Sequence, residues 1–334
     1  MPGDETSGGT ADAPSREVRF TDIGDGISMA DLRTGGLASF NASFLIAARE
    51  PALVESGPAA DADDLTHALA AVGIDPGELA HVVVTHVHLD HAGGAGALLR
   101  RFPRAILWVH EAGARHLADP ERLIASTART YGEDRMRSLY GETVPVPRDR
   151  IEAVVDGQAI ALGDRSLEVL HTPGHASHHV ALMDGASGAM FTGEATGSYL
   201  PWADAYRPAL PPPEVDVDAA LASIGAIRRR QPSRLLVTHF GPIDDAEEGL
   251  RRGAERIEAW AETVRRRLER EPDASDEELV ELLTEQAREE YATDSGQPFE
   301  HERYDAIGSI AMNVRGLARY WRKRWEREGR PEPS

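Results

Sequence analysis

The chain has 334 residues, of which 41% are hydrophobic, so it can bury a large core and its composition is typical of a globular protein. Its formal net charge of −20 argues against nucleic acid and anionic membranes as partners, because binding to phosphate groups usually needs a basic patch. The sequence contains no cysteine, which excludes disulfides, thiolate ligands and cysteine nucleophiles. Any metal site must therefore use nitrogen and oxygen ligands.

The N-terminal segment, residues 1–17, is acidic and rich in Gly, Ser and Pro, and we expect it to be disordered. It has neither the basic nor the apolar stretch of a secretory signal. No part of the sequence approaches the roughly 20 apolar residues of a membrane span. We therefore expect a cytoplasmic protein that does not bind membranes.

Strand and helix signals alternate along the first half of the chain, which is typical of an α/β protein. Residues 39–48 and 51–57 predict a strand pair, and 61–73 predict a helix capped by Asp61. Further predicted elements are a buried strand at 79–86, a helix at 93–102, a strand at 105–110 and a helical stretch at 115–132.

Short strand-like runs separated by turn signals follow, and they favour an antiparallel sheet: 158–164, 166–174, 178–184 and 188–195. A proline-rich connector, a helix with Leu221, Ile224 and Ile227 on one face, and a last strand ending at His239 come next. Residues 244–328 predict three helices, with breaks at "EPDAS" and "TDSGQP". Residues 329–334 are a short tail.

Histidines and carboxylates collect where predicted strands end. The segment "VVVTHVHLDHAGG" places His86, His88, Asp90 and His91 directly after an apolar run. Three later strand ends carry further candidates, namely His175 in "HTPGH", Glu194 in "FTGEA" and His239 in "THFGP". Strand ends are where α/β proteins gather functional side chains, and zinc binds neutral imidazole and carboxylate groups. The pattern therefore predicts a metal site built from several strand ends.

Several other side chains have weaker claims. His171, His178 and His179 could contact substrate, orient the ligands or serve in turns. Three aromatic residues could line a pocket, although isolated aromatics more often serve packing: Tyr131, Tyr199 and Trp202.

The four motifs "THVHLDH", "HTPGH", "FTGEA" and "THFGP" together resemble the metallo-β-lactamase fold hydrolase superfamily, over roughly residues 18–243. This resemblance implies a four-layer αββα sandwich with a dinuclear metal centre at one edge of the sheets. Residues 18–243 would be the catalytic domain and 244–328 a C-terminal helical extension. The resemblance also implies a division of ligands. One metal would be bound by His86, His88 and His175, and the other by Asp90, His91 and His239.

Two residues depart from the family pattern. Glu194 stands where the family usually has a bridging aspartate, and its longer side chain puts full occupancy by two metals in question. Glu55 also stands where an aspartate is common, and we expect it to orient the histidine loop as a hydrogen-bond acceptor.

The resemblance implies a hydrolase whose cofactor is two divalent ions, zinc first and iron or manganese as alternatives. A metal-activated hydroxide would attack a carbonyl of a small ester, thioester or lactone, and Asp90 could accept the proton destined for the leaving group. One alternative is an oxidoreductase of the persulfide dioxygenase kind with a single iron. Another is a non-catalytic module. The helical extension could cap the site or form a homodimer interface, and the sequence leaves both roles open.

Overall fold

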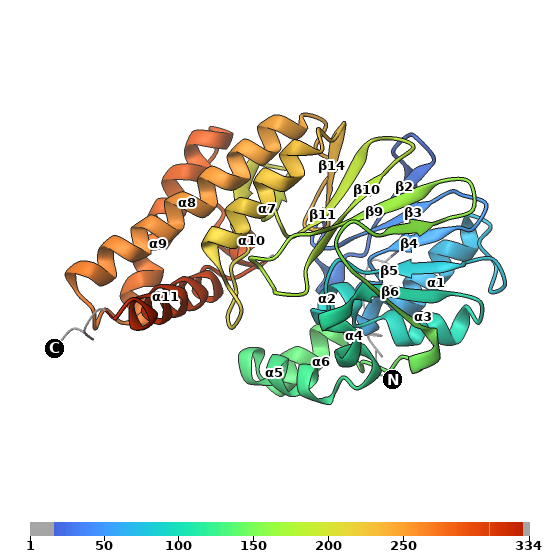
Figure 1. Cartoon of the computed structure of the whole chain (residues 1–334). Helices are drawn as coiled ribbons and strands as arrows, with labels where there is room; N and C mark the ends of the chain where they lie inside the picture. Colours follow the sequence, from blue (N-terminus) through green and yellow to red (C-terminus); the bar gives the residue numbers. More distant parts are fainter. Residues whose placement is uncertain (1–16, 307, 330–334) are drawn as a thin grey trace, which may run out of the picture.

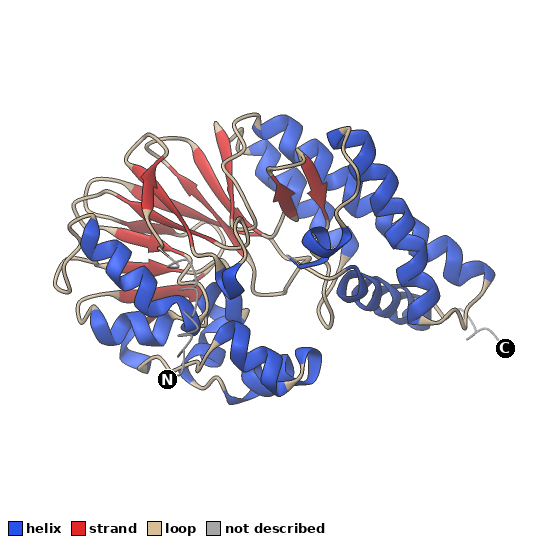
Figure 2. Ribbon diagram, turned by 180° about the vertical axis from the view of Figure 1, so that it is seen from behind, coloured by secondary structure: helices blue, strands red, loops and turns tan. Residues whose placement is uncertain are grey.

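The computed structural model describes residues 17–306 and 308–329. Two β-sheets pack face to face, and helices cover the outer face of each sheet (Figures 1 and 2). The layers therefore follow the order helix, sheet, sheet, helix, which confirms the predicted αββα arrangement. The predicted tails, 1–17 and 329–334, lie almost entirely outside the described residues.

The first sheet has seven strands that follow each other in chain order. The first four strands run antiparallel, whereas β4 to β7 run parallel. The parallel part places the ends of consecutive strands at the same edge of the sheet. The seven strands of the first sheet are β1 (Phe20–Asp22), β2 (Ile27–Asp31), β3 (Ala42–Ile46), β4 (Ala52–Val54), β5 (His81–Val83), β6 (Ile106–His110) and β7 (Ile151–Val154).

The second sheet has five strands in the order β14-β11-β10-β9-β8. Its pairs are antiparallel, as the short runs with turns predict, except that β14 pairs with β11 in parallel. These strands are β8 (Ala159–Ala161), β9 (Ser166–His171), β10 (Val180–Asp184), β11 (Ala189–Gly193) and β14 (Arg234–Val237). A separate hairpin consists of β12 (Ser198–Leu200) and β13 (Ala205–Arg207).

Alternating side chains of the second sheet enter two different cores. In β11, Ala189 and Phe191 pack between the sheets, while Met190 faces the helices on the outside. The Phe191 ring meets Phe44 of the first sheet edge to face, with 5.4 Å between ring centroids. Because successive residues of a strand point to opposite faces, a strand that is apolar throughout must be covered on both sides.

Helices fill the two outer layers and the C-terminal region. Those of the first part are α1 (Ala62–Ala71), α2 (Leu89–Ala92), α3 (Ala95–Arg101), α4 (Glu111–Ala118), α5 (Glu121–Tyr131) and α6 (Glu133–Tyr140). The later helices are α7 (Val217–Arg229), α8 (Ala246–Arg270), α9 (Asp276–Ser295), α10 (His301–Ala306) and α11 (Ile310–Arg327). Three short 3-10 helices are η1 (Thr34–Gly36), η2 (Ala59–Asp61) and η3 (Arg148–Arg150).

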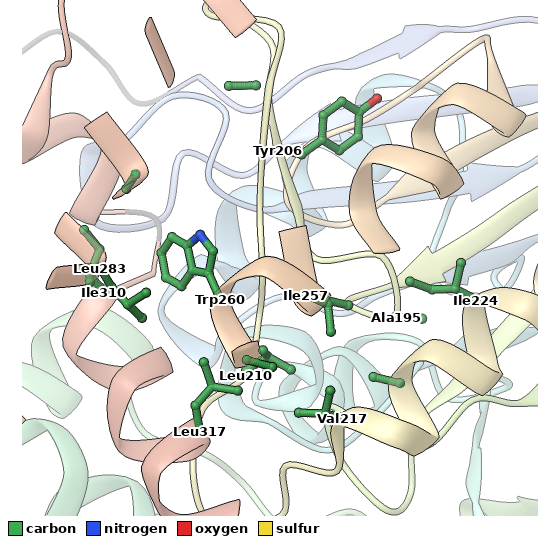
Figure 3. Close-up of a cluster of buried hydrophobic side chains, with 14 of the residues drawn as sticks. Ala195, Tyr206, Leu210, Val217, Ile224, Ile257, Trp260, Leu283, Ile310 and Leu317 are labelled. Atoms are coloured by element: carbon green, nitrogen blue, oxygen red, sulfur yellow. The ribbon is translucent and has the colours of Figure 1, made fainter. Parts of the chain in front are cut away.

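The C-terminal helices share one apolar core with the second sheet. Trp260 of α8 is fully buried, and its indole N–H donates to the Glu290 carboxylate at 3.0 Å. Figure 3 shows Trp260 near Leu283 and Ile310, within a cluster that extends to Ile224 of α7. The same cluster includes side chains of β11 and β14. The division of the chain at residue 243 therefore stays a prediction.

Two predictions about the helices are wrong in detail. Asp61 stands at the N-cap of α1, but its side chain makes no capping bond and instead accepts a hydrogen bond from the buried Thr34 hydroxyl. In the region 244–328 the described residues form four helices, not three, because the short helix α10 precedes α11. Both predicted breaks are confirmed, and Ser275 forms a capping box with Glu278 at the start of α9.

No helix within 17–306 or 308–329 is both long and apolar enough to cross a membrane.

Candidate metal centre

Each predicted ligand follows a strand of one of the two sheets. His86 and His88 lie in the loop after β5, and Asp90 and His91 lie in α2, which directly follows that loop. The remaining three come from the β9–β10 loop and from the residues after β11 and β14: His175, Glu194 and His239. The structure brings all seven together, because the strand ends of both sheets meet at one edge of the sandwich.

The first group of potential ligands is His86, His88, His175 and Glu194, whose donor atoms lie within 4.8 Å of one another. Nδ1 of His88 lies 2.9 Å from Nε2 of His86 and 2.9 Å from Nε2 of His175. Glu194 completes this group through Oε2, which lies 2.8 Å from Nε2 of His175.

The second group is Asp90, His91 and His239, whose donor atoms also lie within 4.8 Å of one another. The Nε2 atoms of His91 and His239 are 3.2 Å apart. Oδ2 of Asp90 lies 3.7 Å from Nε2 of His91 and 3.5 Å from Nε2 of His239. These are the residues that the resemblance assigns to a second metal.

The Glu194 carboxylate lies between the two groups. Its Oε2 atom is 3.3 Å from Nε2 of His86 and 3.4 Å from Nε2 of His91, in addition to its contact with His175. Its other oxygen, Oε1, is 3.7 Å from Nε2 of His239. The longer side chain thus reaches nitrogens of both groups from its position after β11, the arrangement that a bridging ligand requires.

The outer nitrogens of the histidines show which ring nitrogen faces the centre. Nδ1 of His175 donates to the Ala209 carbonyl at 2.9 Å, and Nδ1 of His239 donates to the Phe40 carbonyl at 2.6 Å. A carbonyl oxygen can only accept, so in each neutral ring Nε2 carries a lone pair directed at the centre. Lone pairs that converge in this way repel each other unless a cation lies between them. The donor set therefore fits a divalent metal ion.

Glu55 orients the histidine loop as a hydrogen-bond acceptor, as the sequence predicts. Its side chain is buried and accepts hydrogen bonds from the hydroxyls of Thr85 at 2.5 Å and Thr238 at 3.1 Å. It also accepts from Nδ1 of His91 at 3.2 Å, which leaves Nε2 of that ring for the centre. Glu55 has a positive φ of 67°, so its backbone adopts a left-handed conformation that is uncommon for residues other than glycine. One carboxylate thus joins the ends of β4, β5 and β14.

Burial and neighbouring charges shift the pKa values of the centre in different directions. Burial opposes ionisation of Asp90, but the neighbouring His91 and His239 lower its pKa to about 2. Burial and the adjacent His175 lower the pKa of His88 to about 3, so its ring is neutral near pH 7. For His91, burial is outweighed by Glu55 and Asp90, which raise its pKa well above the usual range. These carboxylates thus attract positive charge into the centre.

Two cavities meet above the centre. The smaller, of about 170 Å³, is lined by Glu194, His175 and His239 and also by Asp305, Ser309 and Asn313 of the C-terminal region. The larger, of about 320 Å³, runs along α5. Both share the same side chains at their junction: His88, Asp90, Tyr131, Tyr140 and Pro211. The C-terminal helices therefore contribute walls to the candidate active site.

The weaker candidates fall into different roles. His179 is buried and accepts a hydrogen bond from the main-chain N–H of Glu194 at Nε2, so it positions a candidate ligand. His178 lines the larger cavity, whereas His171 stacks on His110 with 4.5 Å between centroids. Tyr131 lines both cavities, one of the two roles that its position in the sequence allows.

Tyr199 and Trp202 have packing partners outside these cavities. Tyr199 packs on Tyr206, with 5.0 Å between ring centroids. Trp202 lies under the guanidinium group of Arg303, 3.9 Å from its ring centroid. Sequence reasoning missed Tyr140 and the C-terminal lining residues, since a pattern of residues does not show which distant segments line a cavity. These lining residues are Asp305, Ala306, Gly308, Ser309, Met312 and Asn313.

Family comparison agrees with the fold and the geometry of this centre. Residues 37–239, more than half of the chain, match the model of the metallo-β-lactamase superfamily. The chain belongs to this superfamily, whose members include metal-binding hydrolases.

Among curated proteins, the chain is 27% identical over 127 residues to a metallo-β-lactamase fold-containing protein of Sulfurisphaera tokodaii. It is 33% identical over 128 residues to the human acyl-coenzyme A thioesterase MBLAC2, and 30% identical over 135 residues to a hydroxyacylglutathione hydrolase of Aeromonas hydrophila. The matches cover 37%, 36% and 40% of this chain and 47%, 43% and 39% of these relatives, respectively. The matched segments thus span less than half of each relative.

Solved structures show the same fold. A β-lactamase domain protein from Burkholderia ambifaria has a TM-score of 0.62 at 19% identity, with 92% of this chain and 90% of that chain covered. The metallo-β-lactamase superfamily protein ST1585 from Sulfolobus tokodaii has a TM-score of 0.57 at 19% identity, with 84% and 93% covered.

Proposed function

We propose that this protein is a metal-dependent hydrolase that cleaves the thioester bond of a small molecule. The observation that carries the proposal is the convergence of seven ligand side chains beneath two cavities that could admit a substrate. Esters and lactones offer similar carbonyl groups, but the thioesterase and the hydroxyacylglutathione hydrolase among the relatives favour thioesters.

The ligand division expected from the resemblance suits two ions. His86, His88 and His175 would hold one ion, and Asp90, His91 and His239 would hold the other, with Glu194 contacting both. A divalent ion, zinc by its preference for imidazole and carboxylate, supplies Lewis acidity for activating water and polarising a carbonyl.

Asp90 is the protein group best placed to handle a proton. Its side chain is 19% exposed, compared with 11% for Glu194 and 1% for Glu55, and it lines both cavities. In hydrolysis the oxygen of water forms a bond to the carbonyl carbon, the C–S bond breaks, and sulfur leaves with the electron pair. The Asp90 carboxylate can accept a proton from the attacking water and return it to the sulfur.

Metal analysis and activity test the proposal together. We expect about two zinc ions per chain in the protein after purification and hydrolysis of S-acetyl-N-acetylcysteamine by the metal-loaded enzyme. Replacing His86 and His88 together with alanine should remove most of the metal and the activity, while the circular dichroism spectrum changes little. A matched control replaces the exposed His67 and His301 and should retain both properties.

Other results would contradict the proposal. About one iron per chain with oxidation of a persulfide would favour the oxygenase alternative. Absence of bound metal, or a metal-loaded chain that hydrolyses no thioester, ester or lactone, would favour a non-catalytic module.

A further inference from the structure

The larger cavity begins at the metal centre and extends along one helix. It shares His88 and Asp90 with the smaller cavity, and α5 forms its longest wall. The opposite wall is the proline-rich segment 211–214, and Met312 of α11 contributes a further contact. The cavity is therefore a slot that leads away from the place where a scissile carbonyl would lie.

The helix α5 presents a polar, basic face to this slot. None of its 11 residues is buried: its apolar residues pack, partly buried, against the cluster of Leu89, Met136 and Tyr140, and other residues border the cavity. Arg122 and Arg129 lie seven positions apart, so they share a face about 10 Å apart along the helix axis. Between them the lining includes polar side chains: Ser126 and Thr127.

These two arginines are available to an anion. Within the described part of the chain, neither Arg122 nor Arg129 makes an ion pair, although the chain as a whole is strongly acidic. The acidic side chain on the opposite wall, Glu214, is already engaged by the N–H of Ser177 at 2.9 Å and by its hydroxyl at 2.7 Å. The α5 wall therefore carries two unpaired positive charges.

His178 contributes a buried, neutral ring to the lining of the slot. The residue is 8% exposed, and its Nδ1 atom is buried and has no hydrogen-bond partner among the described residues. Burial lowers the pKa of His178 to about 4, so the ring is neutral near pH 7.

From this placement we propose that the slot along α5 binds the thiol half of the substrate, and that this half carries carboxylate or phosphate groups which Arg122 and Arg129 recognise. The inference rests on the proposed thioester hydrolysis. The thioester carbonyl lies over Asp90 and His88, the leaving thiol extends along α5, and the acyl group occupies the smaller cavity.

The test compares three thioesters that share an acetyl group. S-acetyl-N-acetylcysteamine has a neutral thiol half, S-acetylglutathione carries carboxylates, and acetyl-coenzyme A carries phosphates. In the metal-loaded full chain, the double variant Arg122→Gln/Arg129→Gln should lower kcat/KM for an anionic substrate by about 10- to 100-fold, mainly through KM. The neutral thioester should be cleaved at the unchanged rate. A loss confined to acetyl-coenzyme A would assign phosphate, and one confined to S-acetylglutathione would assign carboxylate.

A matched control replaces two exposed arginines that line neither cavity, Arg137 and Arg148, and removes the same charge. It should leave all three rates unchanged. An equal loss for all three thioesters in the α5 double variant, or no loss for either anionic one, would overturn the inference.

A further experiment distinguishes failure of the proposed thioester hydrolysis from failure of the anion site. If the intact chain cleaves no thioester, calorimetry with desulfo-coenzyme A and S-methylglutathione tests whether the slot binds anions. Neither molecule has a free thiol that could bind the metal. Binding that is weakened about tenfold by the α5 double variant would support the anion site, and absence of binding would overturn it.

Discussion

The main-chain N–H of Glu194 donates a hydrogen bond of 3.0 Å to Nε2 of His179. Nδ1 of the same ring pairs with the Thr172 hydroxyl at 2.8 Å, and since Nε2 accepts, Nδ1 is the donor. Burial lowers the pKa of His179 well below its usual value, which keeps the ring in this neutral form. A buried histidine outside the ligand set thus fixes the backbone of the residue that lies between the two ligand groups.

Removing this acceptor should weaken metal binding. We expect His179→Leu to lower the affinity for zinc by about 10- to 100-fold, the usual effect of losing a group that orients a ligand. His179→Gln keeps a side-chain acceptor and should recover part of the loss. His171→Leu, in a histidine that stacks on His110 away from the centre, is the control. Competition with a chromophoric zinc chelator measures the affinity, and equal values for all variants would contradict the positioning role.

The cluster of candidate ligands could be predicted from the sequence because each of these residues follows a strand with a clear apolar pattern. His86, His88, Asp90 and His91 are also close in sequence, so the local chain alone brings them near one another. The hydrogen-bond acceptors that orient His175 and His239 could not be predicted from the sequence. They are the main-chain carbonyls of Phe40 and Ala209, which any residue could supply.

The elements that sequence reasoning missed are short or depend on distant contacts. β12 and β13 have three residues each, too few to show a period of two. The capping prediction for Asp61 failed because a buried hydroxyl, Thr34, competes for the carboxylate from 27 positions away. Likewise, helix α10 has six residues, and its position depends on Arg207, which donates to the carbonyl of Tyr304 at 2.7 Å.

Close packing of α11 against the chain near His175 gives a further prediction. A Cβ atom at Gly316 would lie 1.9 Å from the carbonyl oxygen of Leu210. The preceding residue, Ala209, has the carbonyl that accepts a hydrogen bond from His175. Gly316→Ala must therefore displace α11 or this segment, and we expect a loss of stability of about 1–3 kcal/mol together with weaker zinc binding. The readouts are urea denaturation and chelator competition.

A second helical glycine provides the control. At Gly225 of α7 a Cβ atom would meet only Arg229 Nη1, at 3.6 Å. Gly225→Ala should therefore be neutral or stabilising by up to about 1 kcal/mol. If both substitutions had the same effect, α11 would not be held closely against the Leu210 carbonyl.

Asp184 should make stability depend on pH. Burial favours the neutral acid, but hydrogen bonds from Arg165 and Ser187 outweigh it and hold the pKa of Asp184 below its usual value. A lowered folded pKa stabilises the protein above the unfolded value of about 3.9, and this contribution is lost as pH falls through the folded pKa. Asp184→Asn should cost about 3 kcal/mol at pH 7.

The measurement compares urea denaturation of the metal-free chains between pH 3 and 7. The difference between the original chain and Asp184→Asn should begin to shrink below about pH 4, because Asp184 of the unfolded chain then gains a proton, and it should disappear once pH falls below the lowered folded pKa. Using this difference removes the titration of the histidine centre, which both chains share. Asp149→Asn, an exposed substitution, should change stability by less than about 0.5 kcal/mol. A pH-independent difference would show that Asp184 remains neutral in the folded chain.

The last prediction concerns the length of Glu194. Its Oε2 atom lies within 3.4 Å of nitrogens from both ligand groups, so shortening the side chain by one methylene withdraws the carboxylate by about 1.5 Å. Glu194→Asp should therefore weaken binding of the second ion and not restore a more typical centre. Glu194→Gln should weaken it further, since it removes the negative charge that offsets two cations. Zinc stoichiometry at equal total zinc, with the hydrolysis rate of S-acetyl-N-acetylcysteamine, distinguishes the three side chains. Equal stoichiometry and rates for Glu, Asp and Gln would show that Glu194 binds no metal, and two ions would then depend on the histidines and Asp90 alone.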